Sequence, residues 1–201
     1  MKKYIVITIL LFMLLGYAIE TDLTLAIDHC IYSHLITFQS DGLTSLFKLI
    51  TFFGGTLWLV ILGIALLMIS AKVNIVHIPF NMLIALLSYR ILKGIYMRPR
   101  PDVLRLIYES NYSFPSGHAT LSMVTYGLLI LELYYRIKNK KIRNLSCALL
   151  AFLILGIGIS RIYLGVHYFT DIIGGYLVGL ILIFIDVLLV EKKKIAYNKK
   201  L

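Results

Sequence analysis

Six apolar runs, each close to the length that crosses a lipid bilayer, constrain the fold of this chain more than any other feature. A helix needs about 20 mostly apolar residues to span the hydrocarbon core of a membrane. Polar or basic turns separate the runs, so each run is expected to form one helix. The sequence therefore predicts an all-α polytopic membrane bundle. Its six transmembrane helices are expected at 4–20, 51–70, 73–93, 118–136, 145–160 and 168–190.

The composition excludes most classes of soluble protein. Hydrophobic residues make up 60% of the 201 residues, charged residues only 15%, and the mean hydropathy is +0.88. Soluble domains are about 45–50% apolar and about 25% charged. A secreted enzyme, a cytosolic enzyme and a disordered regulator are therefore excluded. The length fits one integral-membrane domain, residues 1–201.

The charge is strongly basic, with 20 Lys and Arg against 10 Asp and Glu. Basic residues flank membrane helices on the cytoplasmic side, which explains the excess without a nucleic-acid partner. A six-helix arrangement with both termini in the cytoplasm places thirteen basic residues on that side. They are Lys2, Lys3, Lys72, Arg136, Lys138, Lys140, Lys141, Arg143, Lys192, Lys193, Lys194, Lys199 and Lys200. We therefore expect a multi-pass protein of the cytoplasmic membrane, with extracytoplasmic loops at 20–50, 94–118 and 160–167.

The segment between the first two runs mixes polar and apolar residues, and we expect short amphipathic helices along the outer membrane face. His29 and His34 lie in this segment. Two histidines without a third partner are interpreted as interfacial residues rather than metal ligands. The first run also permits a second interpretation, a signal peptide ending at 16–18, although an uncleaved anchor is favoured. Either interpretation leaves the later topology unchanged.

The first of three candidate functional motifs follows the third run. It carries Lys93, Arg98 and Arg100, while Pro99 and Pro101 hold the segment extended. Positive charge at the outer end of a membrane helix needs a reason, and a bound anion supplies one. Solvation, or contact with lipid headgroups, is the alternative.

The second motif, 114–118, opens the fourth predicted helix. Pro115 suits a helix start because its missing N–H is not needed there. Free amides at a helix N-terminus bind anions, and Gly117 allows a close approach. His118 stands at this point, where it can donate a proton to a leaving oxygen. A Ser-Gly helix cap beside an interfacial histidine explains the same residues equally well.

The third motif, 160–171, joins the fifth and sixth runs. His167 and Asp171 are four residues apart, which places them on one face of a helix. A carboxylate bonded to one ring nitrogen fixes the histidine tautomer and leaves the other nitrogen as a nucleophile or base. A buried histidine satisfied by a nearby carboxylate is the structural alternative.

All three motifs are expected at the outer face, and together they suit phosphoryl transfer. They supply cations for the phosphate oxygens, a nucleophile and an acid for the leaving group. The sequence offers no acidic cluster to hold Mg²⁺, so we expect no metal and no cofactor, with the cations in place of the metal.

The sequence resembles the type-2 phosphatidic-acid phosphatase superfamily of membrane lipid phosphatases. The signature of that superfamily is K-x6-RP, then PSGH, then SR-x5-H-x3-D, and every fixed position matches in order. The matching residues are Lys93, Arg100, Pro101, Pro115, Ser116, Gly117, His118, Ser160, Arg161, His167 and Asp171. The resemblance also covers the six-helix layout and implies a metal-independent phosphatase.

The resemblance implies a role for each matched side chain. His167 would attack phosphorus and form a phosphohistidine, Asp171 would orient His167, and His118 would protonate the leaving group. The phosphate oxygens would be held by Lys93, Arg100, Ser116, Gly117 and Arg161. Arg98 and Arg105 lie outside the signature, where they would either bind a second phosphate or headgroup or be merely solvated.

The expected substrate is a lipid phosphate at the outer leaflet, and undecaprenyl diphosphate is favoured. Phosphatidylglycerophosphate or phosphatidic acid is the alternative. A lipid-to-sugar phosphotransferase is less favoured, and so is a non-catalytic binder or transporter, which would need cations but no pair of histidines. Membrane lipids are the other expected partners, and the sequence gives no sign of an obligate protein partner.

Overall fold

The computed structural model describes the backbone of residues 1–198 and, apart from Ala71 and residues 191–198, their side chains. Within these residues the chain forms eight α-helices and no strand, so the predicted all-α class is confirmed. The helices are α1 (Lys2–Glu20), α2 (Leu25–Ile36), α3 (Asp41–Phe52), α4 (Thr56–Val73), α5 (His77–Tyr96), α6 (Gly117–Arg136), α7 (Lys140–Tyr163) and α8 (Phe169–Asn198).

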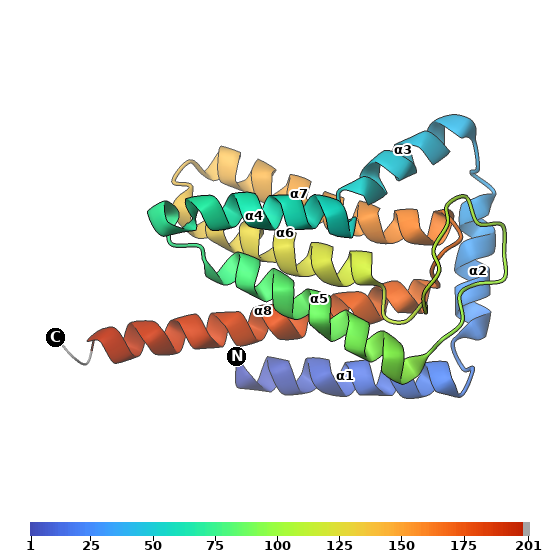
Figure 1. Ribbon diagram of the computed structural model, residues 1–201, viewed down its shortest axis with the longest axis horizontal. Coiled ribbons are helices and arrows are strands. Elements are labelled where there is room, and N and C mark those ends of the chain that lie inside the picture. The colour runs from blue at the N-terminus through green and yellow to red at the C-terminus, as the bar shows by residue number, and fades with distance from the viewer. Residues whose placement is uncertain (199–201) are drawn as a thin grey trace.

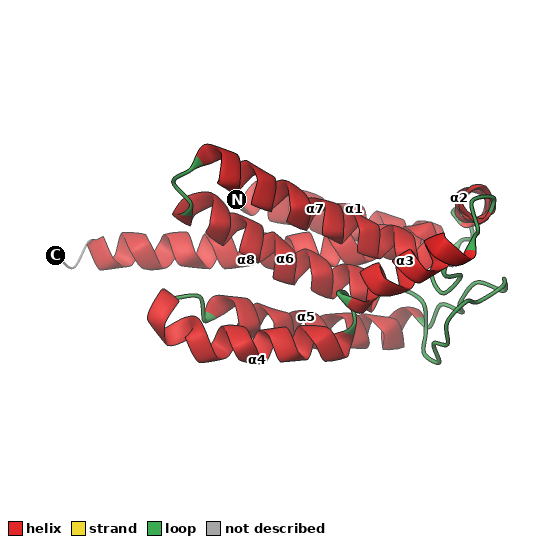
Figure 2. Cartoon of the chain, turned by 90° about the horizontal axis from the view of Figure 1, so that it is seen from above, coloured by secondary structure: helices red, strands yellow, loops and turns green. Residues whose placement is uncertain are grey.

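The long helices run side by side along one axis, and α2 lies across one end of the bundle (Figure 1). Helix α6 is central and packs against α5, α7 and α8, while α1 packs on the outside of α8 (Figure 2). Ala119, Val124 and Leu128 of α6 are almost fully buried. Thr120 and Thr125 of the same helix are buried as well. Burial by its neighbours lets α6 carry polar residues that a lipid-facing helix cannot.

Four helices are long and apolar enough to cross a membrane by themselves: α1, α5, α7 and the Phe169–Val190 part of α8. A fifth crossing arises if α3 and α4, bent by 40° at a short break, count as one span. Helix α6 is not among them, and its sequence contains His118, Glu132 and Arg136 besides several Thr and Ser residues. The chain is thus a membrane protein, and by length and composition the described residues give four or five candidate spans, so the six expected are not confirmed.

The predicted span 51–70 is divided in the structure. Helix α3 ends at Phe52 and α4 begins at Thr56, with Gly54 and Gly55 between them. A Cβ atom built on Gly54 would lie 3.2 Å from Cδ2 of His118. Because Gly54 has no side chain, its backbone can lie close to the His118 ring. The helix is interrupted at this point of the apolar run.

The two short helices expected between the first and second runs are α2 and α3. Helix α3 packs against α7, and α2 contacts α7 and α8. His29 and His34 are exposed on α2, and their nearest aromatic partners are Tyr168 and Phe38. The part of the chain that the structure describes contains no group of three or more metal-ligating side chains.

The bundle has two chemically different ends. The N-terminus and the turns after α4 and α6 lie at the end toward which α8 projects (Figure 1). Helix α2, the segment 97–116 and the turn between α7 and α8 lie at the opposite end. All three sequence motifs therefore converge on the α2 end.

Candidate active site

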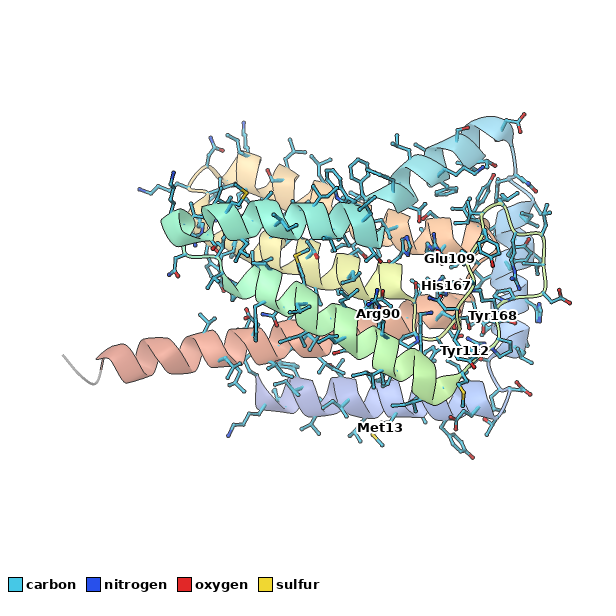
Figure 3. The ribbon with its side chains drawn as sticks, viewed as in Figure 1. Met13, Arg90, Glu109, Tyr112, His167 and Tyr168 are labelled. Carbon is cyan, nitrogen blue, oxygen red and sulfur yellow. The ribbon has the colours of Figure 1, made fainter. Side chains whose placement is uncertain are left out.

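The eight predicted site residues come from four helices and the segments that join them. Lys93 lies in the last turn of α5, Arg161 in the last turn of α7, and Asp171 in the first turn of α8. Figure 3 shows His167 close to Glu109, at the end of the bundle covered by α2. Arg90, by contrast, lies farther along α5 toward the middle of the bundle (Figure 3).

His167 and Asp171 form a buried pair. His167 Nδ1 lies 3.2 Å from Asp171 Oδ2, and the side chains are 2% and 0% exposed. The same Oδ2 accepts the backbone N–H of Tyr168 at 2.9 Å. This contact is the reciprocal half of a capping box, in which an acidic residue in the first turn of a helix reaches back to its N-cap amide. The start of α8 therefore fixes the carboxylate that orients the histidine.

The second ring nitrogen of His167 faces positive charge. Its Nε2 lies 3.4 Å from a guanidinium nitrogen of Arg100. Burial lowers the pKa of His167 well below its ordinary value, and the charges of Lys93, Arg161 and Arg100 lower the pKa further. The imidazole is therefore neutral at pH 7. With Nδ1–H donating to Asp171, Nε2 carries the free lone pair that a nucleophile requires.

The guanidinium groups of Arg161 and Arg100 share the carboxylate of Glu109. Arg161, 1% exposed, forms an ion pair with Glu109 and donates to Thr51 Oγ1 at 3.0 Å. Arg100 lies 3.7 Å from the other carboxylate oxygen of Glu109. The two arginines are thus placed to hold one oxyanion between them. None of the three sequence motifs contains Glu109, although it is an acidic residue in a segment rich in cations.

Lys93 anchors the segment that follows it. Its Nζ donates to the carbonyl oxygens of Tyr112 and, at 3.1 Å, Ser113. An ammonium group has three N–H donors, so one remains for another acceptor. Arg100 is fixed in a similar way, donating to Val166 O at 2.6 Å and to the side chain of Asn111 at 2.9 Å. Both cations are held by backbone carbonyls before any ligand binds.

Ser116, Gly117 and His118 form the start of α6. Ser116 is the N-cap, and its Oγ accepts the Ala119 N–H at 3.5 Å. A Cβ on Gly117 would lie 2.8 Å from the Tyr89 ring, so only glycine fits there. Pro115 lies directly before this cap, close to the helix start as expected. The electrostatic neighbours of His118 are Arg161, His167, Arg100 and Lys93, so its ring lies within the same constellation.

The comparison with known families agrees with this geometry. The family model described as the PAP2 superfamily matches residues 74–195, which contain every predicted site residue. The chain belongs to the PAP2 superfamily. As a PAP2 lipid phosphatase it is a phosphoric ester hydrolase.

Two curated PAP2 relatives are both from Bacillus subtilis (strain 168). Phosphatidylglycerophosphatase B is 32% identical over 187 residues, covering 88% of this chain and 89% of the relative. Undecaprenyl-diphosphatase BcrC is 32% identical over 96 residues, covering 45% of each chain. The chain is thus similar along nearly its whole length to the first relative and along a shorter part to the second.

Two solved structures share the PAP2 fold. The transmembrane PAP2-type phosphatidylglycerolphosphate phosphatase from Bacillus subtilis superimposes with a TM-score of 0.83 at 28% identity, covering 94% of this chain and 96% of that one. LpxE from Aquifex aeolicus gives a TM-score of 0.57 at 22% identity, covering 78% and 92%. The second likeness concerns the fold alone.

Arg98, a cation outside the PAP2 signature, was expected either to bind a second phosphate or headgroup or to be solvated, and the structure shows neither. It is neither solvated nor free for a second phosphate, because it is 7% exposed and ion-paired with two carboxylates. Its partners are Asp171 at 2.7 Å and Asp28 of α2 at 2.8 Å. Asp28 was missed by sequence reasoning, which found no chemistry in the segment that contains it. A lone aspartate more than a hundred residues before the histidine gives no local signal.

Arg105 lies at the mouth of the site. Its guanidinium donates to Pro101 O at 2.9 Å and 3.2 Å. With Arg100, Glu109 and Asn111 it lines a hollow of about 390 Å³ in the segment 99–112. Of the two cations outside the signature, Arg105 is thus the exposed one, and a headgroup, a second phosphate or solvent can meet it there.

Proposed function

We propose that this PAP2 phosphatase hydrolyses a lipid phosphate without metal, through a phosphohistidine on His167. The observation that carries the proposal is the environment of the His167 ring, with Asp171 at Nδ1 and the cations of the site around Nε2. Nε2 attacks phosphorus while the bond to the leaving oxygen breaks, and His118 supplies the proton that this oxygen takes up. Water then attacks the phosphohistidine and gives a proton to His118, which lost its own in the first step, while the P–N bond breaks. Phosphate leaves, and both rings return to their starting states.

The phosphate oxygens are assigned to the cations and to the start of α6. Charge on the equatorial oxygens in phosphoryl transfer is stabilised by fixed donors in a site shielded from water. The ion pairs that Glu109 makes with Arg161 and Arg100 support this assignment, because a carboxylate is an oxyanion too. Lys93, Ser116 and the Gly117 amide complete the proposed set.

Metal independence is tested by measuring phosphate release from detergent-purified protein with and without EDTA. We expect the same turnover in both, because the cations perform the role that Mg²⁺ performs in other phosphoryl-transfer enzymes. Loss of turnover in EDTA, with recovery on adding Mg²⁺, would contradict the proposed site chemistry.

Two substrates are supported about equally. Undecaprenyl diphosphate is favoured by the sequence interpretation and by the similarity to the undecaprenyl-diphosphatase. Phosphatidylglycerophosphate is supported by the longer match to phosphatidylglycerophosphatase B. Both carry a second phosphate in the leaving group, which phosphatidic acid lacks. Comparing kcat/KM for the three lipids decides between them, and a glucose acceptor in the same assay reveals any phosphotransferase activity.

The proposed topology is one domain with six crossings, both termini in the cytoplasm and the α2 end outside. The positions of the flanking cations support it, together with the location of the N-terminus and of two turns at the opposite end (Figure 1). Cysteine labelling in a background lacking Cys30 and Cys147 tests it. An impermeant thiol reagent should modify Asp102→Cys in intact cells and leave Lys138→Cys unmodified. The reverse pattern would place the site in the cytoplasm.

A further inference from the structure

A chain of buried ions connects α2 to the catalytic pair. Asp28 is 1% exposed, Arg98 7% and Asp171 0%. One guanidinium nitrogen of Arg98 donates to Asp171 Oδ1 at 2.7 Å, and the other donates to Asp28 Oδ2 at 2.8 Å. Because Arg98 occupies Oδ1, the oxygen left for His167 is Oδ2. Arg98 thus determines which oxygen of Asp171 meets the nucleophile.

Asp28 also caps α8 from a different helix. Its Oδ1 accepts the backbone N–H of Thr170 at 2.9 Å, and its Oδ2 accepts the Thr170 hydroxyl at 2.8 Å. The first amides of a helix have no partner within it and favour a nearby negative charge. Tyr168, the residue before α8, has no side-chain acceptor suited to this task. The carboxylate of Asp28 therefore holds the turn that carries Asp171.

The face of the Tyr168 ring completes the enclosure of Arg98. The guanidinium carbon lies 4.0 Å from the ring centroid, a cation–π distance. The Arg98 carbonyl accepts the Ser113 N–H at 2.9 Å, which ties the same residue to the end of the 97–116 segment. Arg98 is thus the point at which α2, this segment and α8 meet.

We propose that Asp28 and Arg98 are positioning residues that orient His167 through Asp171, so that the seating of α2 sets the basicity of the nucleophile. This inference rests on the proposed function, in which His167 is the nucleophile. Neither residue touches the phosphate. Arg98 holds the Asp171 carboxylate and withdraws negative charge from it, and Asp28 neutralises Arg98 and holds the first turn of α8.

The two residues have opposite electrostatic effects on His167. Removing the charge of Asp28 makes the surroundings of the ring more positive, which disfavours protonation and lowers the pKa of His167 further. Removing the charge of Arg98 leaves two buried carboxylates near the ring, which favours protonation and raises that pKa. The other charged or titratable groups that face His167 are the same in both variants: Lys93, Arg100, Glu109, His118, Arg161 and Asp171.

The test compares Asp28→Asn, Arg98→Gln and the double variant with the unmodified protein in detergent. The protonation of His167 is followed by NMR of ¹⁵N-labelled histidine, assigned with His167→Ala. We expect His167 to titrate at higher pH in Arg98→Gln, by on the order of one pH unit for a single buried charge. In Asp28→Asn, His167 should titrate at the same pH as in the unmodified protein or at a lower pH. In the double variant, the pH at which His167 titrates should return toward that of the unmodified protein.

Two control variants and one kinetic readout separate positioning from folding. Arg98→Lys keeps the charge and should show a smaller shift than Arg98→Gln. Asp186→Asn removes a buried carboxylate at the opposite end of the bundle and should leave the His167 titration unchanged. In the phosphatase assay, Asp28→Asn should lower kcat far more than it raises KM, because the proposed phosphate ligands remain in place.

The outcomes are distinct. An unchanged or lower His167 titration in Arg98→Gln, or a double variant displaced further than Arg98→Gln, would overturn the inference. Because the titration does not depend on turnover, absence of phosphate release by the unmodified protein would instead count against the proposed function.

Discussion

The two ends of the bundle each contain a histidine paired with an aspartate, and only one pair has the arrangement of a nucleophile. At the α2 end, His167 Nδ1 forms a hydrogen bond with Asp171, while Nε2 lies 3.4 Å from a guanidinium nitrogen of Arg100. At the opposite end, His77 Nδ1 lies 2.9 Å from Asp186 Oδ2, and His77 Nε2 lies 3.2 Å from Glu132 Oε1. Both nitrogens of His77 are occupied, so none is left to react.

The residues around the two histidines differ as well: those around His77 pair with one another, whereas those around His167 include cations that face the ring. Asn81 donates to Asp186 Oδ1 at 2.8 Å, and Glu132 also pairs with Arg136. The His77 cluster therefore joins α5, α6 and α8 by mutually satisfied contacts. The His167 site leaves a ring nitrogen among cations. A histidine–aspartate pair alone thus does not indicate catalysis, whereas a second ring nitrogen that faces cations instead of a carboxylate does.

The largest expected effect is the loss of all turnover in His167→Ala, because the nucleophile is removed. His77→Ala is the matched control. It should retain kcat within about twofold while lowering stability by about 1–2 kcal/mol, as expected for a lost hydrogen-bonded contact. Phosphate release and thermal unfolding in detergent measure the two effects. Comparable loss of kcat in both variants would remove the distinction between the two ends.

Asp171→Asn should reduce kcat severely, since the wrong tautomer of His167 becomes available. The equivalent change in an analogous hydrolase triad costs about 10⁴-fold. Substrate binding should be largely unchanged because the proposed phosphate ligands remain. Asp186→Asn, which alters the carboxylate at the opposite end, should affect stability rather than kcat. Binding of a non-hydrolysable lipid phosphonate to Asp171→Asn checks the first expectation, and absence of binding would show a collapsed site.

His118→Ala should lose roughly 10²- to 10⁴-fold on a lipid phosphate, the usual contribution of a general acid. On p-nitrophenyl phosphate the loss should be much smaller, because that leaving group needs little protonation. The ratio of the two kcat/KM values is the measurement. Equal losses on both substrates would assign His118 to phosphate binding instead of proton donation.

The smallest effect is expected for Glu109→Gln. The Glu109 carboxylate competes with a phosphate for Arg161 and Arg100 and repels it, so the variant should lower KM by roughly two- to tenfold, about the range of a partly exposed ion pair. Inhibition by inorganic phosphate should strengthen in parallel. A raised KM would mean that Glu109 helps to position the substrate.

The meeting of the three motifs at one end of the bundle was predictable, because a chain that crosses the membrane repeatedly brings every second loop to the same side. That argument predicts Lys93, His118 and His167 at the same end of the bundle. Asp28 and Arg98 could not be predicted in the same way. Their pairing joins α2 to the segment after α5, and no local spacing or periodicity encodes a contact between such distant segments.

The division of the second predicted span had a similar cause. An apolar run predicts a continuous helix, and Gly54 and Gly55 alone do not show that the His118 ring lies beside them. Helix α6 also carries polar residues such as Thr120 and Thr125, which neighbouring helices bury, and hydropathy does not register that burial. In both places, tertiary packing supplies contacts that the apolar pattern of the sequence does not encode.

The central claim is that His167 is the nucleophile, and trapping the covalent intermediate tests it most directly. Protein mixed briefly with a ³²P-labelled lipid phosphate should be quenched in alkali, digested and mapped. The account predicts acid-labile, alkali-stable label on the peptide that contains His167, and its absence in His167→Ala but not in His77→Ala. Label on His118, or label that persists in His167→Ala, would contradict the account.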